Sequence, residues 1–117
     1  MLNQVVMVGR IVADPKVIEN EEGKQVCNVT IAVPRSYKNI NGEYDTDFID
    51  VTLFNGIAQN TAEYCKKGDL VGIKGRIQTN EIVKDDEKNK YTNVVAEKVT
   101  FLSSRTNTRD ESELERE

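Results

Sequence analysis

Hydrophobic and polar residues alternate with a period of two over most of the chain. In the segment DFIDVTLF, the aliphatic residues Ile49, Val51 and Leu53 share one parity. Successive side chains of a strand point to opposite faces, so such alternation predicts a strand with one buried face. The segment QVVMVGRIV is instead apolar on both parities, which predicts burial on both sides. The predicted strands are residues 4–12, 25–33, 47–54, 70–80 and 91–102.

The hydrophobic period changes after the third predicted strand. In the segment NGIAQNTAEYCKKG, apolar and small residues recur at the spacing of a helix. Lys66 and Lys67 suit the C-terminal turn of this helix, and Gly68 suits the position just beyond it. The sequence therefore predicts one short helix between the third and fourth strands.

This order of elements is typical of the OB-fold, a five-stranded Greek-key barrel that is partly open. Glycines inside the strands, Gly9, Gly72 and Gly75, fit the sharp coiling that barrel closure needs. An SH3-like barrel is the alternative, but it does not require a helix at that place. We expect an all-β domain with one helix over residues 1–102, followed by a polar, acidic tail without fixed structure over residues 103–117.

Composition narrows the classes of function. The 117 residues contain no histidine and two cysteines, which removes the commonest general base and argues against a zinc site. We therefore expect no metal, no cofactor and no catalysis, and we expect Cys27 and Cys65 to be buried as small apolar residues. No apolar run is long enough to span a membrane and no signal peptide is recognisable, so we expect a cytoplasmic protein.

The second parity of DFIDVTLF is unusual for a solvent-facing side. It carries Phe48 and Phe54 in a chain with only three Phe and four Tyr. These two rings are roughly 20 Å apart at about 3.3 Å per residue, far enough to meet separate bases. Proteins that bind single-stranded nucleic acid combine such aromatic platforms with cations, and Tyr37 lies between cations in the segment RSYK.

The net charge of −4 does not indicate a basic protein, so any basic surface must come from segregation of charge by face. The candidate cations are Arg10, Arg35, Lys38, Lys74, Arg76, Lys84 and Lys88. Each feature also has a structural explanation, because Phe48 or Phe54 could cap the barrel and Lys74 and Arg76 could form a solvated face. The pattern alone favours an OB-type binder of oligonucleotides or of proteins.

Four segments resemble the bacterial-type single-stranded DNA-binding protein family: LNQVVMVGRIVADP, NVTIAV, DFIDVTLFNGIAQNTAEYCKKGDLVGIKGRIQT and YTNVVAEKV. Their order and spacing match over most of residues 1–102. The resemblance implies an OB-fold, commonly a homotetramer, that wraps single-stranded DNA without sequence preference. It also implies a role in DNA replication, recombination and repair, on the nucleoid.

The resemblance assigns base stacking to Tyr37, Phe48 and Phe54. A fourth stacking position falls at about Ile82, which is not aromatic. The tail ending in ESELERE lacks the hydrophobic tip through which family members recruit replication and repair proteins, so the resemblance does not carry that mode of recruitment to this chain. A short tail is compatible with a phage- or plasmid-encoded member.

Two other functions remain open on the sequence. One is an OB-type module that binds proteins in a primosome-like complex. The other is an OB-fold nuclease, which needs a cluster of carboxylates around a metal. Asp45, Asp47 and Asp50 are clustered but form no metal-ligand motif, so the nuclease is the weaker alternative.

Overall fold

The computed structural model describes residues 1–103 of the chain. Apart from Ser103, the predicted acidic tail (103–117) lies outside the described residues. The elements are β1 (Val5–Ile11), β2 (Val17–Glu19), β3 (Gln25–Lys38), β4 (Tyr44–Phe54), α1 (Asn55–Tyr64), β5 (Leu70–Lys84) and β6 (Glu87–Ser103).

The sheet closes into a barrel because β1 pairs with two strands, β3 on one side and β5 on the other. The remaining neighbours are β5–β6, β6–β4 and β4–β3, and β4–β6 is a parallel pair. This closed five-stranded barrel with a helix between β4 and β5 is the predicted OB-fold, so the fold prediction is confirmed. The short strand β2, which pairs with β3, was not predicted.

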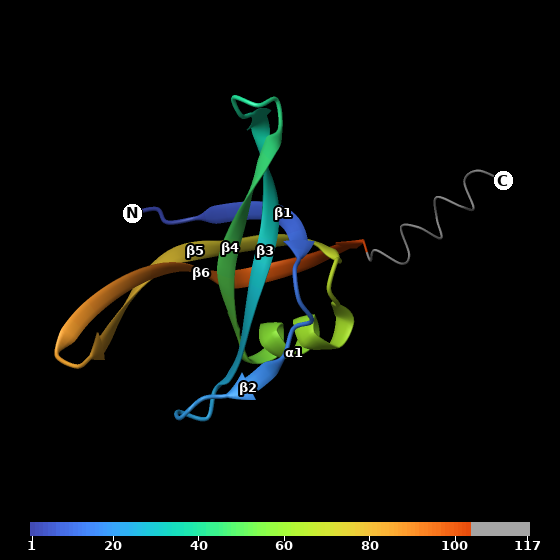
Figure 1. Ribbon diagram of the computed structural model, residues 1–117. Helices are drawn as coiled ribbons and strands as arrows, with labels where there is room; N and C mark the ends of the chain where they lie inside the picture. Colours follow the sequence, from blue (N-terminus) through green and yellow to red (C-terminus); the bar gives the residue numbers. More distant parts are fainter. Residues whose placement is uncertain (104–117) are drawn as a thin grey trace.

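Several strands are longer than predicted. The hairpins β3–β4 and β5–β6 continue beyond the barrel as two-stranded ribbons, which project in different directions in Figure 1. The β3–β4 pairing even passes Pro34, with an irregular register between Pro34 and Lys38. The alternating pattern identified the barrel parts of these strands, whereas the ribbons carry polar residues on both faces.

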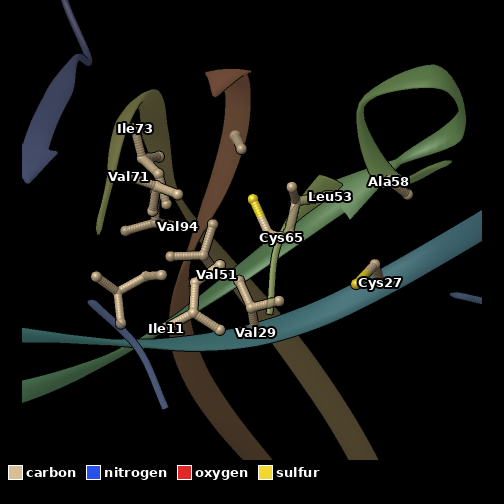
Figure 2. Packing of buried hydrophobic residues seen from close by; sticks show 12 residues of the cluster. Ile11, Cys27, Val29, Val51, Leu53, Ala58, Cys65, Val71, Ile73 and Val94 are labelled. Carbon is tan, nitrogen blue, oxygen red and sulfur yellow. The ribbon is translucent and has the colours of Figure 1, made fainter. Parts of the chain in front are cut away.

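The buried core is aliphatic, as the alternation predicts. Val51 and Leu53 of β4 have no exposed surface, and Figure 2 shows them among side chains from the other strands and from α1. Cys27 and Cys65 are buried as expected, and burial raises the pKa of the Cys65 thiol to about 11. Val6 and Val8 are exposed on the outer face of β1 in the single chain, so burial of that face stays a prediction about contacts between chains.

The helix α1 covers one end of the barrel and buries Ala58 and Thr61. It ends at Tyr64 with Cys65 as the cap, so Lys66 and Lys67 follow the helix and do not form its last turn. Gly68 adopts a positive φ of 93°, which suits the expected turn. In the described part of the chain, α1 is the only helix and is far too short to cross a membrane.

Gly75 is the strand glycine that a neighbouring backbone approaches most closely. It lies where the β5–β6 register shifts between Lys74 and Gly75. A Cβ atom there would overlap the backbone carbonyl of Val95, whereas a Cβ at Gly72 would make only ordinary contacts with Leu102 and Thr100. The backbone of β6 therefore leaves no room for a side chain at Gly75.

We expect Gly75→Ala to lower the free energy of unfolding by about 1–3 kcal/mol, because the new methyl group forces the two strands apart. Gly72→Ala is the matched control, and it should leave stability unchanged or slightly higher, since glycine weakens a strand interior. Urea denaturation measures both changes. If the two variants are equally stable, the backbones of β5 and β6 accommodate the added methyl group without loss of stability.

Candidate nucleic-acid interface

The site begins on the outer face of β4. Phe48 and Asp50 are exposed there, and Thr52 and Phe54 are half-buried. The opposite parity of the strand enters the core, so these four side chains point outward as a consequence of strand alternation. The two phenylalanines therefore lie at opposite ends of a polar strip.

A ladder of side-chain hydrogen bonds crosses four strands on this face. Thr52 Oγ1 donates to Asn28 Oδ1 of β3 over 3.0 Å and accepts from Asn93 Nδ2 of β6 over 2.6 Å. Asn93 Oδ1 accepts in turn from Asn80 Nδ2 of β5 over 2.7 Å, and Asn80 Oδ1 accepts from Gln78 Nε2 over 3.0 Å. We call these five residues the polar ladder. It ties β3, β4, β6 and β5 into one floor whose side-chain positions are mutually determined.

Three adjoining hollows follow the polar ladder and together form a groove. One is lined by Phe54 and Tyr91, the central one by Tyr91 and Asp50, and the third by Asp50 and Phe48. Asn93 lines all three hollows. The groove therefore runs from Phe54 to Phe48 over the polar floor.

The two predicted phenylalanines differ in their surroundings. Phe48 is 67% exposed, so most of its ring surface is available to a ligand. Phe54 is half-buried and lines its hollow together with Ile18, Val26 and Val95. Phe54 is thus a less accessible wall of the groove than Phe48.

Tyr91 was missed by the sequence analysis. It is 46% exposed and shares two of the three hollows with the predicted residues. It pairs with Asn80 across the β5–β6 ribbon and shares the parity of Asn93 along β6. That shared parity was visible in the segment YTNVV, but only the pairing of β6 with β4 shows that it joins the face of Phe48.

Tyr37 and Lys38 lie on the β3–β4 ribbon, beyond the barrel. Tyr37 is 64% exposed. The ammonium of Lys38 lies 5.8 Å from the ring centroid of Tyr44, another exposed aromatic residue that the sequence analysis did not select. This ribbon therefore presents two aromatic rings and a cation away from the groove itself.

Arg35 is held by acidic neighbours on the same ribbon. Its Nη2 donates to Asp47 Oδ1 over 2.9 Å and its Nε donates to Asp47 Oδ2 over 3.2 Å, while Asp45 Oδ2 lies 3.6 Å from Nη1. The hydrogen bonds from Arg35 lower the pKa of Asp47, and the same bonds raise the pKa of Arg35. A phosphate would therefore have to share this guanidinium with Asp47.

Arg76 borders the groove, whereas Lys74 does not face the same way. Arg76 pairs with Val95, which is itself the parallel neighbour of Thr52. Lys74 lies between Val6 and Lys98 on the outer side of β1, β5 and β6. The two cations share a parity along β5, but the register shift between Lys74 and Gly75 gives them different neighbours on β6.

The remaining predicted residues do not line the groove. Arg10 donates from Nη1 to the carbonyl of Gly68 over 2.9 Å. On the β5–β6 ribbon, Ile82 is 50% exposed and shares the parity of Lys84. Lys88 Nζ is 4.0 Å from Glu81 Oε1 on the opposite parity. Lys84 and Lys88 therefore lie on opposite faces of the ribbon.

Comparison with known proteins adds evidence that is independent of this geometry. Residues 2–102 match the model of the single-strand binding protein family. "Single-stranded DNA-binding protein B" of Bacillus subtilis (strain 168) is 46% identical over 87% of this chain and 91% of its own length. "Single-stranded DNA-binding protein 1" of Clostridium acetobutylicum is 42% identical over 89% of this chain and 96% of its own length. The resemblance found in the sequence is confirmed: the chain belongs to the single-strand binding protein family.

Proposed function

We propose that this protein binds single-stranded DNA, as a sheath that protects the strand during replication, recombination and repair. The observation that carries the proposal is the groove, whose walls are the aromatic rings of Phe48, Phe54 and Tyr91. Every base has a π-face, so aromatic walls bind bases of any sequence. Family membership supports a binding protein and not an enzyme.

The groove is suited to bases, and the cations around it are suited to the phosphate backbone of the DNA strand. Its floor is the polar ladder, whose side chains hydrogen-bond one another across the strands that carry the aromatic walls. Arg76 lies at the border of the groove, and Lys84 and Lys38 lie on the two ribbons. We propose that the strand follows the groove between the ribbons, with Tyr37 and Ile82 contacting bases beyond its ends.

We further propose that the protein assembles with copies of itself as a homotetramer in the cytoplasm, on the nucleoid. The outer face of β1 supports this assembly, because Val6 and Val8 are 71% and 50% exposed on a regular strand. Leu102 of β6 extends the same apolar face, since it lies beside Gly72, the partner of Val8. Burial of this face against a second copy would remove apolar surface from water.

Phe48→Ala and Tyr91→Ala should each weaken binding to single-stranded DNA by about 1–3 kcal/mol, the usual effect of removing one base stack. Tyr64→Ala is the control, because Tyr64 is an exposed aromatic residue on α1 that packs against Phe101 and not into the groove. Binding of oligo-dT by the Phe48 and Tyr64 variants is measured from the change in intrinsic tyrosine fluorescence. Labelled oligo-dT gives the affinity of all three variants. Negligible binding of the unaltered protein would favour the protein-binding alternative.

Arg76→Ala should reduce the slope of log affinity against log salt by about 0.7 for each phosphate that the protein no longer neutralises, and Lys74→Ala, on the outer side of the barrel, should reduce it less. Lys66→Ala, which removes an exposed cation beyond the end of α1, should leave the slope unchanged. Oligo-dT titrations over a range of salt concentrations give the slopes. If Arg76→Ala keeps the original slope, Arg76 belongs to a solvated face.

Val6→Lys/Val8→Lys should dissociate the assembly without unfolding the barrel, since both side chains point away from the core. Analytical ultracentrifugation at micromolar concentration should find a tetramer for the unaltered protein and smaller species for the variant. Circular dichroism provides the control for folding. A monomeric unaltered protein would contradict the proposed assembly.

A further inference from the structure

The central hollow of the groove contains a carboxylate where a DNA-binding surface would be expected to be basic. The hollow has a volume of about 470 Å³. Its lining residues are Asn28, Val29, Thr30, Asp50, Thr52, Tyr91, Thr92 and Asn93. Within this set, drawn from residues 1–103, there is no Lys or Arg, and Asp50 is the only charged side chain. A phosphate group is therefore disfavoured at this place.

The hydrogen-bond partners in the hollow leave an acceptor available. The hydroxyl of Thr30 donates to Asp50 Oδ1 over 2.9 Å, and the hydroxyl of Thr52 donates to Asn28. Both hydroxyl hydrogens are thus used within the floor. A carboxylate offers about four lone-pair sites, of which Thr30 occupies one. Asp50, which is exposed, keeps the capacity to accept further hydrogen bonds from a ligand.

Asp50 is within reach of bases on two aromatic walls. It lines the central hollow together with Tyr91 and the next hollow together with Phe48. Phe48 and Asp50 lie two residues apart on one face of β4, about 7 Å along the strand. A base that stacks on either ring therefore brings its edge toward the carboxylate. In a single strand, the Watson–Crick edge of that base is free to be read.

We infer that Asp50 accepts a hydrogen bond from the exocyclic amino group of one base in each protomer. This inference rests on the proposed binding of single-stranded DNA. The N4 amino group of cytosine is a donor that carboxylates accept, whereas the O4 atom of thymine or uracil is an acceptor that a carboxylate repels. Asp50 is then a specificity-determining residue that favours cytosine over uracil or thymine at this one subsite. Stacking elsewhere in the groove remains tolerant of sequence.

The test compares oligo-dC with oligo-dU of equal length, because the two pyrimidines differ at position 4 and N3 but not in a methyl group. Labelled oligonucleotides are titrated with the full chain at one salt concentration, and the ratio of the two affinities is recorded. Asp50→Asn keeps an acceptor for Thr30 but removes the negative charge and adds a donor. It should lower the preference for oligo-dC relative to oligo-dU by roughly 3- to 10-fold.

Glu63→Gln is the matched control, since it removes the same charge from an exposed position on α1 and should leave the ratio unchanged. An oligo-dC with N4,N4-dimethylated bases provides a second measurement, because it lacks the donor. It should bind the unaltered protein less tightly than oligo-dC, and Asp50→Asn should discriminate less between the two.

If Asp50→Asn tightens binding of both oligonucleotides by the same factor, Asp50 only repels the backbone and the inference is wrong. An unchanged ratio and unchanged affinities would equally overturn it. Failure of the unaltered protein to bind any single strand would instead overturn the proposed function itself, together with this subsite.

Discussion

The structure depends on one constraint, the closure of the sheet through β1. Because β1 pairs with β3 and with β5, the two sheet edges that would otherwise be exposed are joined. Closure demands sharp coiling, and Gly75 provides it where the carbonyl of Val95 approaches too closely for any side chain. It also brings β4 beside β6 as a parallel pair. That pairing aligns Thr52 with Val95 and so builds the groove.

Closure also gives the two parities of β4 different surroundings. Val51 and Leu53 point into the core and account for stability, while Phe48, Asp50, Thr52 and Phe54 remain for a ligand. The ligand-facing side is polar, and the members of the polar ladder hydrogen-bond one another across neighbouring strands or, for Gln78 and Asn80, two positions apart on β5. A preformed floor reduces the ordering that binding would otherwise require.

The net charge of this protein says little about its individual cations, whose surroundings differ. A chain with a net charge of −4 nevertheless belongs to the single-strand binding protein family. The structure shows individual cations with different surroundings: Arg35 is engaged by Asp47, Arg10 donates to a backbone carbonyl, and Arg76 lies at the border of the groove. Binding that relies on aromatic walls needs fewer cations than binding that relies on phosphate contacts alone.

The sequence by itself determined the order of the five barrel strands and the helix along the chain. It also determined the buried face of each strand, because the alternation of apolar residues reports which face is buried. It also selected Phe48 as a candidate for an exposed ring, because that residue breaks the polar pattern of its face, and the structure shows the ring 67% exposed. Only the tertiary structure decided which strands are neighbours. The membership of Tyr91 in the groove, the different surroundings of Lys74 and Arg76, and the pairing of Arg35 with Asp47 depend on cross-strand register and barrel curvature, which a local pattern of side chains does not contain.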